Sequence, residues 1–235
     1  MSEYNIQMNK YNALNAGYDQ LYPATKIANV DGLSTALQNN DPRNWGLDLS
    51  KSLTDANDGT RNGFYAVTVG AANVPFDYGV LLVHNLGNPN FVHQELTEFF
   101  GGIKACRGGA WDDSTSAVKW QPWEWVNPPM QLGVEYRTTE RYLGKPVYAM
   151  AVDCGATPNA TTKDVIIKSS GVEELVFASF KLSSSQMLPY KFNGHEVIFN
   201  TAVYSDGELM VFITSNDDQS MKTVTGIVKY TKTTD

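Results

Sequence analysis

The sequence predicts an all-β protein with a short helical segment near its N-terminus, a small central β domain and a C-terminal antiparallel β-sandwich. Two observations predict this class. From residue 46 onward, short runs of β-branched and aromatic residues alternate with Gly, Pro, Asn and Asp, as in strands joined by turns. After residue 130 these runs recur at regular intervals with no helical periodicity among them, which is typical of a sandwich.

Residues 1–45 form an N-terminal arm, rich in Asn, Gln, Asp and Ala and poor in β-branched residues. Within it Ile27, Val30, Leu33 and Leu37 recur at steps of three and four, which predicts an amphipathic helix of about three turns. Because an isolated helix this short is marginal in water, it must pack against something. We expect the four residues to join copies of the chain into a short parallel bundle; the alternative is that the helix folds back on its own globular part.

The central β domain is expected at residues 46–129. Strands are predicted at 64–69 and 80–83, each bounded by turn residues, and 91–103 is expected to be extended because it mixes β-branched and aromatic residues. The Asn-Pro-Pro sequence at 127–129 breaks the chain. It is therefore the expected domain boundary.

Residues 130–235 are expected to form the antiparallel sandwich. Alternation at 134–139 predicts a half-exposed strand, whereas 147–152 is apolar on both faces and predicts a deeply buried one. Asp206-Gly207 lies between two apolar strands and predicts a hairpin with a type I′ turn, and Asn193-Gly194 predicts a second hairpin.

Composition narrows the possible partners. The chain is 42% hydrophobic with a formal charge of −7, and its Lys and Arg residues are scattered, so no basic patch is available for nucleic acid. The longest aliphatic run, at 80–83, is far too short to cross a bilayer, and residues 1–14 lack the pattern of an export signal. We expect neither nucleic-acid binding nor membrane insertion.

The spacings that catalysis or cofactor binding requires are not found, so the sequence predicts no catalytic residue, no metal and no cofactor. Cys106 and Cys154 lie in separate segments and are expected to be buried free thiols. Histidines and adjacent acid pairs are expected at surfaces and turns. The two acids of a pair would not converge on one glycosidic bond, because neighbouring residues of a strand point to opposite faces. The histidines and acid pairs are His84, His93, His195, Asp112-Asp113, Glu173-Glu174 and Asp217-Asp218.

Aromatic residues near predicted loops are the candidate binding residues. Trp111 and Trp120 flank the polar loop 112–116, and Tyr190 and Tyr204 lie beside the two predicted hairpin turns. Aromatic rings at such positions can stack on sugar faces while nearby Asp or Asn accepts hydroxyl hydrogen bonds. The alternative is that each ring fills a core or a subunit interface.

Several segments resemble tail-fibre and receptor-binding proteins of bacteriophages and prophages. Residues 21–33 (LYPATKIANVDGL) are similar to the trimerising linker of such fibres, and 133–148 (GVEYRTTERYLGKPVY) to the opening strands of fibre head domains. Four further segments resemble the pyocin-knob module, although the loop 112–119 lengthens the path to its final tryptophans. These segments are GFYAV at 63–67, PFDYGVLLV at 75–83, FVHQEL at 91–96 and WQPWEW at 120–125.

This resemblance implies a homotrimeric virion protein, made in the bacterial cytoplasm, whose arm joins other tail proteins and whose head binds a bacterial surface receptor, commonly a saccharide. Identical sites on a trimer would raise a weak affinity for sugar through avidity, and no catalysis is needed. Two alternatives stay open: a structural tail connector or cap, and a glycan-degrading tail enzyme.

Overall fold

The computed structural model describes residues 11–12, 17–18, 52–85, 90–183, 185–218 and 222–234. The chain divides into two units, residues 1–48 and 49–235. In the first, β1 (Tyr11–Asn12) pairs antiparallel with β2 (Gly17–Tyr18). The predicted helix and its four seam residues, Ile27, Val30, Leu33 and Leu37, lie outside the described residues.

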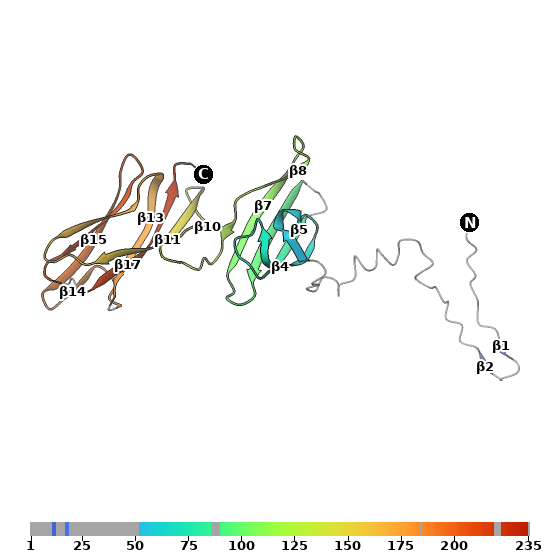
Figure 1. Ribbon diagram of the computed structural model, residues 1–235, viewed down its shortest axis with the longest axis horizontal. Coiled ribbons are helices and arrows are strands. Elements are labelled where there is room, and N and C mark those ends of the chain that lie inside the picture. The colour runs from blue at the N-terminus through green and yellow to red at the C-terminus, as the bar shows by residue number, and fades with distance from the viewer. Residues whose placement is uncertain are drawn as a thin grey trace. The chain divides into compact units, whose positions relative to one another are not determined.

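The first strands of the second unit, residues 52–125, are here called the knob (Figure 1). Its strands form one sheet in the order β9-β7-β6-β5-β4-β3, with β8 attached to β7; β3 runs parallel to β4 and the other pairs are antiparallel. A 3-10 turn, η4, spans Ala56–Asp58. The strands are β3 (Ser52–Asp55), β4 (Gly63–Ala72), β5 (Gly79–Asn85), β6 (Phe91–Glu98), β7 (Lys104–Asp112), β8 (Ala117–Trp120) and β9 (Glu124–Trp125).

One face of the knob sheet is covered by the knob's own connections. Leu81, Val83, Val92 and Leu96 are buried in alternation along β5 and β6, and Ala56 of η4 is buried with them. The half-buried side chains packed against this cluster include Val118, Trp120 and Trp123. The core therefore depends on loops and tryptophans, not on a second sheet.

Residues 135–232 of the same unit, which we call the head, form a sandwich of two four-stranded antiparallel layers, the first of which continues through β9 into the knob sheet. The sheet orders are β10-β11-β17-β13 and β14-β15-β16-β12. Both sheets contribute to one hydrophobic cluster that includes Phe180, Val211 and Tyr230, which confirms the all-β class and the sandwich. The strands are β10 (Glu135–Tyr142), β11 (Lys145–Ala156), β12 (Thr162–Lys168), β13 (Val172–Leu182), β14 (Tyr190–Phe192), β15 (His195–Val203), β16 (Leu209–Ser215) and β17 (Thr223–Lys232).

Strand β11 is buried on both faces over residues 147–152, as predicted. Its inward side chains, such as Met150, join the sandwich core. On the other side, the segment after β9 runs alongside the strand, with Leu132 bridging to Ala151 and Gly133 N donating to Ala151 O at 2.8 Å. The chain between knob and head thus packs on the head sheet.

The knob sheet and the head sheet that contains β10 meet at β9. Trp125 pairs with Ala105 of β7 and, in parallel, with Thr138 of β10. Its ring lies 5.7 Å from that of Phe76 and 5.2 Å from that of Tyr136. The two hydrophobic clusters fall on either side of residue 129, and a division there remains a prediction.

The two predicted hairpin turns differ in form. Asn193 and Gly194 both have positive φ, 50° and 85°, and Phe192 pairs with His195, as a two-residue type I′ turn requires. At Asp206-Gly207 the hairpin is confirmed but the turn type was wrong. Only Gly207 has positive φ, and the connection spans residues 204–208.

The prediction that 91–103 is extended throughout was wrong. Strand β6 ends at Glu98, and the chain turns before β7 begins at Lys104, with Glu98 N donating to Ile103 O at 2.8 Å. Gly102 takes a φ of 65°, which glycine adopts without the steric cost of a side chain. The local flexibility of Gly101-Gly102 therefore overrides the strand preference of Phe99 and Phe100.

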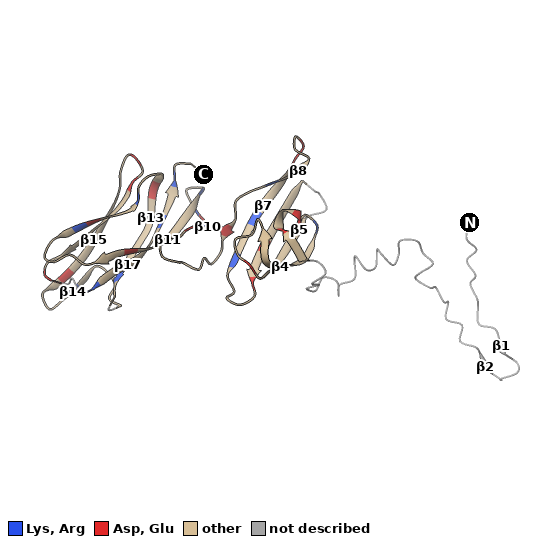
Figure 2. Cartoon of the chain, viewed as in Figure 1, with Lys and Arg blue, Asp and Glu red and all other residues tan. Residues whose placement is uncertain are grey.

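Charged side chains of both signs are interspersed over the described strands (Figure 2). Among the described residues no helix has the length and apolar character needed to span a membrane.

Candidate functional site

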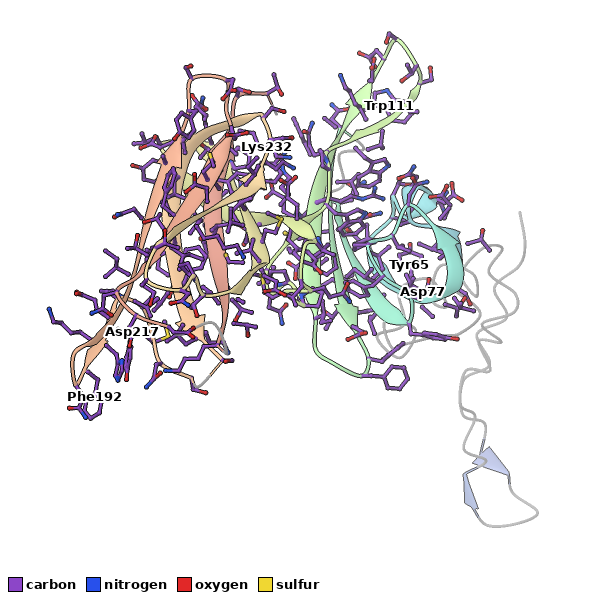
Figure 3. The ribbon with its side chains drawn as sticks, turned by 60° about the vertical axis from the view of Figure 1, so that its left-hand side comes forward. Tyr65, Asp77, Trp111, Phe192, Asp217 and Lys232 are labelled. Atoms are coloured by element: carbon purple, nitrogen blue, oxygen red, sulfur yellow. The ribbon has the colours of Figure 1, made fainter. Side chains whose placement is uncertain are left out.

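Trp111 lies near the end of β7, next to the hairpin that joins this strand to β8 (Figure 3). The side chain is 40% exposed. The adjacent Asp112 accepts hydrogen bonds at Oδ1 from the hydroxyl (2.5 Å) and the backbone N–H (2.9 Å) of Ser114, which hold the pKa of Asp112 below its usual value. The partly exposed indole and the fixed carboxylate are thus adjacent in sequence, and as consecutive residues of one strand they point to opposite faces of it.

Trp120, by contrast, is half-buried and takes part in the knob core. Its ring and that of Trp123 both lie close to the Arg107 guanidinium, whose Cζ is 4.3 Å and 4.5 Å from the two ring centroids. Burial lowers the pKa of Arg107 to about 10. The contacts of Trp120 are those of a cation–π interaction inside the domain.

Gln94 connects Arg107 to the loop that covers the knob sheet. Its side chain is fully buried, donates to the carbonyls of Ala56 (2.6 Å) and Gly59 (2.8 Å), and accepts from Arg107 Nε at 2.9 Å. Arg107 Nη2 also donates to Asn57 Oδ1 at 2.9 Å. This network satisfies buried polar groups and holds the η4 region on the sheet.

The two predicted tyrosines lie at opposite ends of β15. Tyr190 pairs with Val197 near the start of the strand, is half-buried against the head core, and has Lys222 Nζ 5.3 Å from its ring. Tyr204 follows the end of the strand and is 47% exposed. The structure therefore does not bring the four predicted aromatics into one site, and it leaves Trp111 and Tyr204 as the more exposed pair.

The head contains a serine, an aspartate and a histidine close together, but not in the order that nucleophilic catalysis needs. His195 Nδ1 contacts Asp217 Oδ2. The Ser215 hydroxyl donates instead to the Asp217 carbonyl at 2.8 Å, and Ser215 is buried. A nucleophile requires a base within hydrogen-bond reach; here the short contact of the hydroxyl is to a carbonyl, and the Asp217 carboxylate lies at 3.5 Å, the limit of a hydrogen bond.

Other titratable groups are engaged in structural contacts. In the adjacent pair Glu173-Glu174, Glu173 binds Lys145 Nζ at 2.6 Å and Glu174 accepts from the Tyr142 hydroxyl at 3.1 Å. Burial raises the pKa of the Cys154 thiol to about 11, and Cys106 is half-buried. Within the described ranges, no three His, Cys, Asp or Glu side chains are grouped so as to hold a metal ion.

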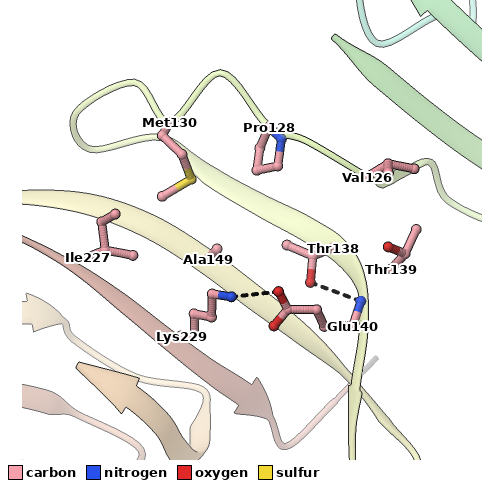
Figure 4. A pocket seen from close by; sticks show the side chains of 9 residues that line it. All are labelled: Val126, Pro128, Met130, Thr138, Thr139, Glu140, Ala149, Ile227 and Lys229. Atoms are coloured by element: carbon pink, nitrogen blue, oxygen red, sulfur yellow. Dashed lines mark hydrogen bonds and ion pairs between the residues drawn. The ribbon is translucent and has the colours of Figure 1, made fainter. Parts of the chain in front are cut away.

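A groove of about 230 Å³ follows the outer face of the head sheet (Figure 4). The segment after β9 forms one wall, with Val126, Pro128 and Met130. An ion pair between Lys229 and Glu140, 2.5 Å apart, lies among the lining residues. The groove is mainly apolar, and its two charged lining residues neutralise each other.

A second hollow, of about 210 Å³, is lined in part by Glu124, Arg137 and Arg141. Glu124 accepts from Arg137 Nε at 3.0 Å and from Arg141 Nη2 at 2.7 Å. Because one carboxylate engages both guanidinium groups, the arrangement joins β9 to β10.

The sequence interpretation missed several exposed aromatic residues of the knob, among them Tyr78, Phe99 and Phe100. Phe100 is 85% exposed, which is unusual for a large apolar side chain. The available signal was Phe99-Phe100 immediately before Gly101-Gly102, since paired glycines mark a turn.

No protein-family model and no curated protein matches the chain. Solved structures that match include an N-truncated R2-type pyocin tail fibre, at 10% identity over 80% of this chain and 97% of that chain, with a TM-score of 0.27. A C-terminal part of an R2 pyocin fibre of P. aeruginosa matches at 11% identity over 80% and 66%, with a TM-score of 0.27. The corresponding part of the R1 pyocin fibre matches at 11% over 76% and 65%, with a TM-score of 0.25. At these values the similarity establishes no common role.

Proposed function

We propose that the chain is a tip component of a bacteriophage tail fibre that attaches the virion to a saccharide on the bacterial surface, as a homotrimer and without catalysis. The observation behind this proposal is that aromatic side chains are exposed at connections between firmly paired strands. Trp111 beside Asp112, and Tyr204 two residues before Asp206, are the main examples. Binding residues are often found on such connections, because the strands position them rigidly.

The chemistry of these positions suits sugar binding. A ring stacks on the apolar face of a pyranose, and a carboxylate accepts hydrogen bonds from its hydroxyls. A single contact of this kind is weak, so several copies are needed for firm attachment. In the proposed assembly, Ile27, Val30, Leu33 and Leu37 join three chains, and the arm connects them to other tail proteins.

The proposal includes that the chain does not catalyse cleavage of the saccharide that it binds. Its support is that, in the described parts of the chain, the serine beside the His195–Asp217 contact is buried and its hydroxyl donates to a backbone carbonyl at 2.8 Å. The adjacent acids Glu173 and Glu174 are bound by different partners. Two carboxylates acting on one glycosidic bond would have to converge on it.

The test is attachment to host cells and binding to a glycan array, with the full chain as wild type, Trp111→Ala and Tyr204→Ala. Phe177→Ala is the matched control, because Phe177 is 49% exposed on a sheet face away from these connections. We expect attachment and a defined glycan signal for wild type and the control, and a loss of about tenfold or more in at least one aromatic variant.

Light scattering of the same samples should give the mass of a trimer, reduced to that of a monomer by Leu33→Asp. A wild-type protein that binds neither cells nor glycans would contradict the proposal and favour the connector role. Release of reducing sugar from host polysaccharide would favour the enzyme.

A further inference from the structure

A compact aromatic cluster lies at the end of the knob where β5 begins and β6 ends. We call it the aromatic tip: Tyr78, Phe99 and Phe100, with the neighbouring carboxylates Asp77 and Glu98. The three rings are about half to almost fully exposed. Exposed aromatic side chains cost hydrophobic free energy that burial would recover, so a gathered set of them marks a binding surface.

The rings of the aromatic tip are held in place by the backbone. Phe99 N donates to Tyr78 O at 3.1 Å, and the Tyr78 and Phe100 ring centroids are 6.3 Å apart with their planes at 68°. Tyr78 adopts a φ of 56°. A bulky residue pays roughly 1–2 kcal/mol for this left-handed conformation, and such strain is concentrated at functional sites.

Each carboxylate of the aromatic tip has one oxygen fixed and one available. Asp77 Oδ1 accepts from Gly70 N at 3.3 Å, and Glu98 Oε2 accepts from Gly101 N at 2.9 Å. Among the described residues, neither Asp77 Oδ2 nor Glu98 Oε1 has a hydrogen-bond partner. Both acids are thus oriented by the backbone while keeping acceptor capacity for a ligand.

The negative charge of the aromatic tip disfavours anionic ligands and contact with a second, identical tip. Lys104, the first residue of the next strand, binds Glu95 instead of either acid of the tip. An anionic ligand would therefore meet two carboxylates without a compensating cation. Contact between two identical tips across a two-fold axis would likewise bring like charges together.

We propose that the aromatic tip is a saccharide site that takes a pyranose with free hydroxyls and no acidic group. The pyranose CH face would lie on the Phe100 ring, with the Tyr78 ring, inclined at 68° to it, against the edge of the sugar. The free oxygens of Asp77 and Glu98 would accept its hydroxyls. This inference rests on the proposed function and adds a second site to it. Trp111 lies toward the other end of the nine-residue strand β7, about 25 Å away.

The site is tested by ¹⁵N–¹H NMR titration of the full chain with methyl glycosides of glucose, galactose, mannose and N-acetylglucosamine, and with methyl glucuronide as the acidic probe. We expect at least one neutral glycoside to shift residues 77–79 and 98–102 saturably, with a Kd on the order of 1–10 mM. The glucuronide should bind about tenfold more weakly.

Phe100→Ala and Glu98→Gln should each weaken binding of that glycoside by about tenfold, equivalent to about 1.4 kcal/mol. Trp111→Ala and Phe177→Ala should leave it unchanged. Because Phe100 is almost fully exposed, its removal should leave the Tm nearly unchanged, so a loss of binding reports on the site.

Attachment of the same variants to host cells separates the two proposals. If wild type attaches and no neutral glycoside shifts the tip, or if Phe100→Ala binds as wild type does, the tip proposal is overturned while the receptor-binding function stands. Failure of wild type to attach overturns the proposed function, even if the tip titrates. A lower mass of Phe100→Ala by light scattering would show that the tip contacts another copy, and would also overturn the saccharide site.

Discussion

The knob and the head are both built from antiparallel strands, but they bury their cores in different ways. The head closes two sheets on each other, so Phe180, Val211 and Tyr230 are buried among other apolar side chains. The knob has one sheet, and it covers that sheet with η4, connecting loops and tryptophans. At its centre lies a hydrogen-bonded pair, Gln94 and Arg107.

This difference shows how a small domain compensates for a missing layer. Buried amide and guanidinium groups are costly unless their hydrogen bonds are made, and here they are used to hold a loop over the sheet. The head depends on apolar area, whereas the knob depends on apolar area together with directional bonds. Loss of a buried apolar side chain should therefore be most costly in the head, and loss of a buried hydrogen-bonding side chain should matter in the knob.

The largest effect is expected from Phe180→Ala in the head. Phe180 is fully buried, and its ring centroid lies 4.8 Å from that of Phe199. The ring also packs directly on Gly226, where an added Cβ would lie 2.3 Å from Phe180 Cδ1. Truncation should lower the free energy of unfolding by about 3–5 kcal/mol. Urea denaturation measures this loss, and Phe177→Ala on the exposed face is the control. A loss below about 1 kcal/mol would show that the head core repacks freely.

A smaller loss is expected from Gln94→Leu in the knob. The substitution keeps the side chain's size but removes two donors and one acceptor. It leaves the Gly59 carbonyl and Arg107 Nε without these partners, and the Ala56 carbonyl with Gly59 N alone. Unsatisfied buried groups should cost about 1–3 kcal/mol in urea denaturation. Gln121→Leu, on an exposed residue, should be nearly neutral. Equal effects of the two would mean that the network does not hold the knob loop.

A pH-dependent effect is expected from Glu135→Gln in the head. Burial raises the pKa of Glu135, but hydrogen bonds from Lys232, Tyr230 and Lys168 outweigh it and keep the pKa below its ordinary 4.5. A carboxyl with a depressed pKa stabilises the fold above its unfolded pKa, and this contribution is lost as pH falls through the folded value. The variant should therefore have a lower Tm than wild type at pH 7, and the gap should close below about pH 4.5.

Glu140→Gln is the matched control for this titration. Glu140 pairs with Lys229 alone, and its side chain is 53% exposed, so its contribution should be small and screened by salt. A Tm difference for Glu135→Gln that stays constant from pH 7 to acid would contradict the assigned role of the charged carboxylate.

The smallest perturbation is the chemical labelling of the two thiols, which reports on each region without changing its core. Burial raises the pKa of Cys154 from 9.0 to about 11, so its thiolate fraction at neutral pH is lowered roughly 100-fold. The pKa of Cys106 is also raised by burial, but that residue is only half-buried. In Cys106→Ser and Cys154→Ser variants, iodoacetamide should modify Cys106 first. Faster modification of Cys154 in the native protein would show that the head opens before the knob.

Much of the strand pattern could be predicted from local sequence. The apolar run at 147–152 predicted a strand buried on both faces, and Asn193-Gly194 forms a tight turn because both residues tolerate positive φ. At Asp206-Gly207 the same reasoning failed. Val172 N donates to Gly207 O at 3.0 Å, so this connection is shaped by its contact with β13 in the opposite sheet.

The candidate site was predictable only in part. Exposure of Trp111 near a polar hairpin followed from its neighbours in sequence, but the half-burial of Trp120 depends on Arg107, which lies on another strand. The aromatic tip was missed because Phe99 and Phe100 favour strands locally, and nothing in the sequence shows that both rings are exposed.

Sequence alone therefore determined the all-β class, most strand positions and the places of the two hairpins, because these depend on residue alternation and on the backbone freedom of a few residues. Tertiary structure decided which aromatic rings are buried, which face the solvent and which acids keep a free oxygen. Those properties depend on contacts between strands far apart in the chain, and local preferences do not encode them.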